Sequence, residues 1–120
     1  MSAKAADEFT RYLLDQLQAI GPVSGRRMFG GYGFFLDGMM FALVADQTLY
    51  LKADDDSRSR FEAEGLTQFV YERKGKPATM SYYQAPPESL ESRDILADWA
   101  NLAFAAALRA GAKKGSPRRG

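Results

Sequence analysis

The chain has 120 residues and a formal net charge of +1, and it is 46% hydrophobic and 26% charged, a balance typical of one globular domain. No apolar run approaches the ~18–20 residues of a membrane helix, and the acids near the N-terminus interrupt any secretory signal, so we expect neither. Cysteine and histidine are absent, which excludes disulfides, thiol nucleophiles, histidine-based triads and nearly every zinc site.

The near-neutral charge conceals an uneven distribution. Residues 113–120 hold four basic residues and no acid, which leaves 12 basic and 15 acidic residues in the remainder, a net charge of −3. A mildly acidic body is not typical of an obligate DNA-binding domain. The lack of cysteine fits a reducing cytoplasm, so we expect a cytoplasmic location.

The first half of the chain predicts one helix followed by a meander of strands. Apolar residues at helical spacing indicate an amphipathic helix over residues 4–20, which Gly21-Pro22 ends. A short strand at 26–29 is then followed by two apolar runs that Asp37-Gly38 joins, a strong hairpin pattern. Residues 48–52 alternate as a half-buried strand does.

The second half predicts a helix, a hairpin and a last helix. Residues 54–64 form a short helix with Gly65 as its C-terminal cap, and a second hairpin at 69–83 turns at 74–77. Ser92 caps a last helix that runs to about Ala110 and that Gly111 ends. Its expected apolar stripe consists of Ile95, Trp99, Leu102, Ala103 and Ala106.

The predicted architecture is a two-layer α+β fold, an antiparallel sheet with helices packed on it. The element order is helix, three or four strands, helix, two strands, helix. We expect a single domain over residues 1–111 and a disordered basic tail over residues 112–120.

Two local patterns suggest chemistry but have simpler structural explanations. Residues 31–35 resemble the aromatic RNA-binding strand of an RNA-recognition motif, yet their flanks and the strand order differ, so the glycines more readily permit a bulge or a close approach. Asp54, Asp55 and Asp56 suggest a metal site, but helix capping explains them. We therefore predict no metal site, no cofactor and no catalytic residues.

A basic turn among aromatic residues is the more informative feature. Arg73, Lys74 and Lys76 stand near Tyr82, and Arg26-Arg27 forms a second small cationic spot. Basic side chains beside aromatic faces bind phosphate and stacked bases, although a solvated turn has the same composition. These six residues are the candidate contacts with a protein partner or a nucleic acid.

Several blocks of the sequence resemble the N-terminal domain of the TfoX/Sxy family. They include Arg27-Met28-Phe29-Gly30-Gly31-Tyr32-Gly33, Thr48-Leu49-Tyr50-Leu51-Lys52 and Tyr71-Glu72-Arg73-Lys74-Gly75-Lys76-Pro77, and they stand in family order between about residues 8 and 110. The resemblance implies a small α+β domain and regulation of natural competence, the family's better-known role in bacterial transformation. Those regulators carry a second, C-terminal domain where this chain has a short basic tail, so a role in competence itself stays open.

Together these observations favour a non-enzymatic regulatory module that works through protein contacts, with the transcription machinery or another regulator as its partner. The alternative is direct nucleic-acid binding through the turn at residues 73–76, Arg26-Arg27 and the basic tail. That alternative includes weak, non-specific DNA contact by the tail. An enzyme or a small-ligand binder that uses Tyr, Arg and Lys groups is a third reading. The partner, the regulated genes and the oligomeric state stay open.

Overall fold

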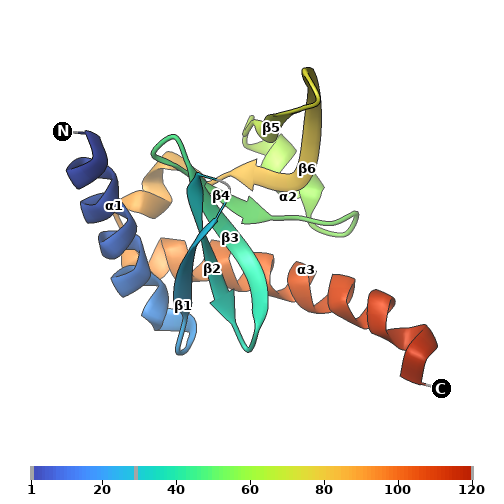
Figure 1. Ribbon diagram of the computed structural model, residues 1–120. Coiled ribbons are helices and arrows are strands. Elements are labelled where there is room, and N and C mark those ends of the chain that lie inside the picture. Colours follow the sequence, from blue (N-terminus) through green and yellow to red (C-terminus); the bar gives the residue numbers. More distant parts are fainter. Residues whose placement is uncertain (1, 29, 120) are drawn as a thin grey trace.

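A computed structural model shows the arrangement of the elements (Figure 1). It describes the backbone of residues 2–28 and 30–119 and the side chains of residues 8–28 and 30–112. The elements follow in the order α1 (Ser2–Leu17), η1 (Gln18–Ile20), β1 (Ser24–Met28), β2 (Gly31–Leu36), β3 (Met39–Ala45), β4 (Thr48–Lys52), α2 (Arg58–Ala63), β5 (Gln68–Arg73), β6 (Lys76–Gln84), η2 (Pro87–Leu90) and α3 (Arg93–Arg119). Within these limits, none of the helices is long and apolar enough to cross a membrane.

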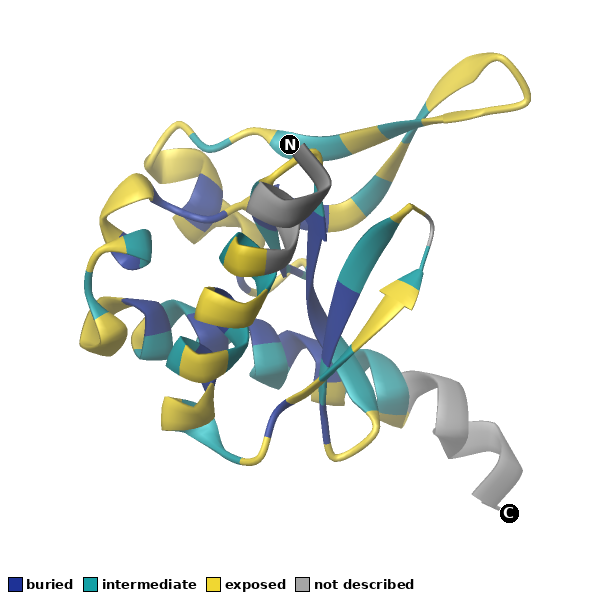
Figure 2. Ribbon diagram, turned by 60° about the vertical axis from the view of Figure 1, so that its left-hand side comes forward, coloured by how far each residue is buried: buried dark blue, intermediate teal, exposed yellow. Residues whose placement is uncertain are grey.

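The strands form one antiparallel sheet in the order β1-β2-β3-β4-β6-β5, and the helices gather on one side of it (Figure 2). The predicted α+β architecture and its element order are therefore confirmed. The main core lies between the layers, where Leu13 and Leu17 of α1 and Leu96 of α3 meet sheet residues such as Phe34 and Leu51. Burial of this apolar surface is the main stabilising contribution to the fold.

Two-residue turns join the strands in three hairpins. The turns at Asp37-Gly38, Asp46-Gln47 and Lys74-Gly75 have positive φ at both positions, between 52° and 78°. This geometry matches the right-handed twist of paired strands. The tight turn predicted for Asp37-Gly38 is present, and Lys74-Gly75 uses the same conformation.

Close backbone approach explains the glycines of β2. A Cβ on Gly31 would overlap the carbonyl oxygen of Val44, on the neighbouring strand β3. The β2–β3 register also shifts between Phe34 and Phe35, which marks a bulge. The close approach at Gly31 agrees with the structural explanation that the sequence favours over an RNA-binding strand, whereas the bulge lies beyond the glycines.

Helix α3 is longer than expected, and its buried stripe is offset from the predicted one. Ser92 caps it as predicted, since its Oγ accepts the Ile95 N–H at 3.2 Å. The helix does not end at Gly111 but continues to Arg119, because Gly111 is a helical position packed against Met39 of β3. The predicted disorder of residues 112–120 concerns side chains almost all outside the described range, and it stays a prediction.

The offset of the stripe follows from the helix rotation. Ile95 is 36% exposed, and the fully buried positions are Leu96, Ala100, Ala103, Ala106 and Ala107. Trp99 and Leu102 are half-buried and pack on the edge of the core. The small alanines allow α3 to lie close to the sheet, whereas the sequence pattern favours the larger Ile95 as the buried position.

Candidate interaction surface

The sheet has a second face that the helices leave uncovered. Side chains alternate along each strand, so the neighbours of the core residues point the other way. On β3 and β4, Leu43 and Tyr50 are paired with each other and lie outside the main core cluster. At the far end of the sheet the β5–β6 hairpin, residues 68–80, projects beyond β4 as a two-stranded arm (Figure 1).

A largely apolar groove of about 390 Å³ lies between the arm and strands β1–β3. Its lining consists of Met28, Gly31, Tyr32, Leu43, Val44, Ala45, Phe69, Tyr71, Glu72 and Met80. On the arm side, the Phe69 ring stacks on Tyr71 with centroids 5.9 Å apart and lies 4.7 Å from the ring of Tyr50. This half-buried aromatic row offers a rigid apolar surface to a ligand or a partner.

Met28 gives the other side of the groove an adaptable side chain. The space where a Cβ of Gly33 would lie is occupied by the sulfur atoms of Met28 and Met40, at 2.7 and 2.9 Å. A larger residue than Gly33 would displace both. Flexible, polarisable thioether side chains adapt to different apolar contacts, and they are frequent at protein-binding surfaces.

Two of the predicted cationic groups lie next in sequence to groove-lining residues of β1 and β5, although none of their members lines the groove itself. β1 and β5 are the two edges of the sheet, yet Met28 of β1 and Glu72 of β5 line the same groove. Arg26 on β1 lies over the Phe35 ring at 4.8 Å from its centroid. Arg73, next to Glu72, and the exposed Lys74 and Lys76 form the tip of the arm.

Two of the six candidate residues have different surroundings. Tyr82 is only 4% exposed, its hydroxyl lies 3.4 Å from the Met40 carbonyl oxygen, and the Lys52 ammonium lies over its ring at 5.2 Å. Burial raises the pKa of Tyr82 well above its ordinary value, and little of the ring is open to a partner. Arg27 is exposed but pairs with Tyr32, so it projects to the other face of β1 from Arg26.

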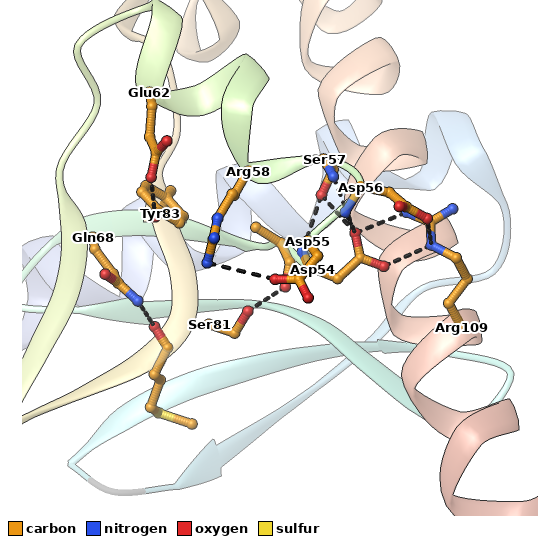
Figure 3. Close-up of polar contacts among 12 residues, drawn as sticks. Asp54, Asp55, Asp56, Ser57, Arg58, Glu62, Gln68, Ser81, Tyr83 and Arg109 are labelled. Atoms are coloured by element: carbon orange, nitrogen blue, oxygen red, sulfur yellow. Dashed lines mark hydrogen bonds and ion pairs between the residues drawn. The ribbon is translucent and has the colours of Figure 1, made fainter.

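The sequence predicts that Asp54, Asp55 and Asp56 open and cap a helix over residues 54–64, but α2 begins only at Arg58, and its N-cap residue Ser57 makes no side-chain capping hydrogen bond. Asp54 Oδ1 accepts the Asp56 and Ser57 N–H groups, and Ser57 Oγ accepts the Asp54 N–H in return (Figure 3). This reciprocal pattern resembles a capping box, but it closes the turn at residues 54–57 that precedes α2. Arg109 of α3 adds a contact that the sequence does not predict: its Nε and Nη2 donate to the Asp54 carboxylate at 2.6 and 3.0 Å.

The ion pair ties the turn before α2 to Arg109 in the second half of α3. The hydrogen bonds from Arg109, with those from Ser57, lower the pKa of Asp54 to about 2 against the opposing effect of burial. Asp56 lies 3.4 Å from Arg109, whereas Asp55 pairs with Arg58 at 3.5 Å. The carboxylates are thus held by the protein's own cations, and this cluster has a structural role.

A known protein family covers the groove and most of the fold. The model of the TfoX N-terminal domain family matches residues 15–107, which span all six strands and most of α3. The chain belongs to the TfoX N-terminal domain family. The matched range includes the groove and the arm, so both are features of the family domain in this chain.

Two curated relatives give the same assignment. The DNA transformation protein TfoX1 of Aliivibrio fischeri is 36% identical over 67 residues, which is 56% of this chain and 32% of that protein. Protein Sxy of Escherichia coli is 30% identical over 70 residues, 58% of this chain and 34% of that protein. The chain thus spans about a third of the length of these relatives.

The groove residues are those that sequence reasoning missed. Leu43, Phe69 and Met80 read as ordinary strand residues, because either face of an amphipathic strand can be the buried one. One sequence feature does point to the groove: β3 is apolar at consecutive positions from Met39 to Ala45. Such a run is typical of a strand with apolar surroundings on both faces.

Proposed function

We propose that this TfoX-type domain is a non-enzymatic regulatory module that binds a protein partner in the groove between the arm and strands β1–β3. The partner segment presents apolar or aromatic side chains with acidic residues beside them. The regulatory role is supported by membership of the TfoX N-terminal domain family, and one relative is named a DNA transformation protein.

The observation that carries this proposal is an apolar groove whose lining residues on β1 and β5 have basic residues close to them in the sequence. The aromatic row and the methionines supply non-directional apolar contact, which favours protein side chains. Arg26, on β1, and Lys74 and Lys76, at the arm tip, are exposed and favour an acidic partner segment. Glu72 is the acidic residue within the lining, and it lies beside Arg73.

Site-specific photocrosslinking in cells tests the proposal. A photoreactive residue in place of Met80, inside the groove, is expected to give protein adducts. The same residue in place of the exposed Asp98 on α3 is the control and is expected to give none. Arg26→Glu should reduce the Met80 adducts severalfold, and Arg11→Glu, a matched charge reversal on the exposed side of α1, should not.

Direct nucleic-acid binding is the outcome that would overturn the proposal. Adducts at Met80 that a nuclease removes, or equal adducts at Met80 and Asp98, contradict a protein site in the groove. A filter-binding salt series on double-stranded DNA adds an independent measure, since a phosphate-binding site gives a steep salt dependence. We expect Lys74→Ala with Lys76→Ala to leave that series nearly unchanged.

A further inference from the structure

The strand β5 is an open edge of the sheet. It is last in the strand order and pairs with β6 alone. Because Arg73 and Lys76 flank a two-residue turn, they form a hydrogen-bonded pair, and the pairs then alternate along the hairpin. The main-chain N–H and C=O groups of Val70 and Glu72 therefore point outward from the sheet. Pro77, which has no N–H, sits opposite Glu72 in agreement with this alternation.

The centre of this edge, at Val70 and Tyr71, has neither a charge nor a proline to oppose strand pairing. Among the residues whose side chains are described, Val70 is the most exposed large hydrophobic, at 53%. β5 contains no proline and ends in its two charged residues, Glu72 and Arg73. The opposite edge strand, β1, carries two arginines at its centre, a common device against unwanted pairing.

We infer that β5 pairs antiparallel with β5 of a second copy of this chain, with Tyr71 on the two-fold axis. In this register Val70 lies opposite the partner's Glu72, and their outward main-chain groups bond to each other. Phe69 lies opposite the partner's Arg73, which favours a cation–π contact. Tyr71 meets the partner's Tyr71 on the groove face, so the aromatic rows of the two copies become continuous.

The charges at the two ends of β5 complement each other in this arrangement. The arm tip carries Arg73, Lys74 and Lys76, whereas the exposed Glu62 and Glu64 stand shortly before the strand begins. A six-residue strand separates the two ends by about 20 Å. Antiparallel pairing brings each basic tip to the partner's acidic end, and the two-fold symmetry forms this contact twice.

Neighbouring registers are less favourable. A shift of two residues one way places Glu72 opposite the partner's Glu72, and like charges directly opposite are destabilising. A shift the other way extends the pairing toward Gln68, where the β5–β6 register is irregular and the Gln68 side chain donates to the Met80 carbonyl oxygen. The register centred on Tyr71 avoids both.

Cysteine crosslinking of the purified chain tests the register. The chain has no native cysteine, so any disulfide joins the introduced residues. Facing Cα atoms in a non-hydrogen-bonded pair are about 4.5 Å apart, within disulfide range. Tyr71→Cys should give covalent dimer under mild oxidation, and a mixture of Phe69→Cys and Arg73→Cys should give mainly the mixed dimer. Thr79→Cys, the β6 neighbour of Val70, is the control and should give little.

A charge swap tests the same contact without a disulfide. Lys74→Glu alone and Glu64→Lys alone should each weaken the dimer about 3–10-fold by sedimentation equilibrium, and the combined variant should recover. Recovery requires contact between two copies, because the two positions lie at opposite ends of β5. A chain that stays monomeric at all concentrations, or crosslinks equally at Tyr71 and Thr79, overturns this inference. Neither result bears on the groove, so the proposed function stands or fails separately.

Discussion

The effect of a substitution in this domain depends on which atoms surround the substituted residue. Gly31 faces the Val44 carbonyl oxygen, which cannot move without distorting β3, whereas Gly38 has open space around its missing Cβ. Asp54 is held from two directions, by the turn before α2 and by Arg109. Both sites allow matched comparisons.

We expect Gly31→Ala to destabilise the fold by more than about 2 kcal/mol, because the new Cβ would overlap main-chain atoms of the neighbouring strand. Gly38→Ala is the control: its φ of 77° is unfavourable for alanine but no atom is displaced, so the cost should be about 1 kcal/mol. Urea unfolding of both variants measures the difference. Equal costs would show that β2 can move away from β3.

The Asp54–Arg109 pair should make stability depend on pH in the acidic range. The pKa of Asp54 is lowered from 3.8 to about 2 in the folded state, so its contribution is fully present above about pH 4 and is lost as the pH falls toward 2. We expect Asp54→Asn to cost about 1–2 kcal/mol at pH 7 and almost nothing near pH 2. Asp55→Asn, whose ion pair is exposed, should cost less than about 0.5 kcal/mol in the same urea titrations.

At the scale of elements, α3 shows which features of a helix the sequence predicts and which it does not. The helix and its Ser92 cap are predictable, because capping residues and apolar spacing are local properties, whereas Trp99, which the sequence places on the buried stripe, is only half-buried. The rotation of the buried stripe is not predictable, because alanines and larger apolar residues both recur at helical spacing along α3. The proximity of Gly111 to Met39 is not predictable either, because Met39 is distant in sequence.

Trp99 and Ile95 give the test of this rotation. The Trp99 ring lies 5.1 Å from Phe61 and has the Arg60 guanidinium 5.6 Å from its centroid. Trp99→Ala should therefore cost about 2–4 kcal/mol in thermal or urea unfolding. Ile95→Ala, on the exposed border of the helix, should cost less than about 1 kcal/mol. A larger loss of stability for Ile95→Ala than for Trp99→Ala would show that Ile95, and not Trp99, belongs to the buried stripe.

The groove shows the limit of sequence reasoning at this scale. The tight turns at Asp37-Gly38 and Lys74-Gly75 can be read from local residue preferences. Residues of β1 and β5 line the same groove because of the curvature of the whole sheet. That curvature depends on contacts between residues that are distant in the sequence. Arg26 and the arm tip are therefore separate spots in the sequence, and only the fold brings the groove residues near them together.

For the molecule as a whole, we expect the core to form without residues 113–120. The last described contacts of α3 with the rest of the domain are those of Arg109 with Asp54 and of Gly111 with Met39. Deletion of residues 113–120 should leave the melting temperature within about 2 °C of the parent, because it removes no buried apolar surface that the structure describes.

The same deletion should remove most non-specific DNA retention at low salt, since residues 113–120 hold four basic residues and the remainder of the chain is acidic on balance. A filter-binding salt series on the parent and the truncated chain measures this. Tight binding that survives the truncation and is lost in Lys74→Ala with Lys76→Ala would instead place a nucleic-acid site on the arm.

The arm should open locally more often than the rest of the sheet, and amide hydrogen exchange measures this opening. It joins the rest of the sheet through three β4–β6 pairs at Tyr82, Tyr83 and Gln84, and the side chains of residues 72–77 at its tip are exposed. Its amide protons should therefore exchange with deuterium through local opening, well before those of β2–β4, which exchange only with global unfolding. Any molecule that occupies the arm should slow that exchange at residues 69–79 first, so exchange mass spectrometry reports occupancy even when the bound molecule is unidentified.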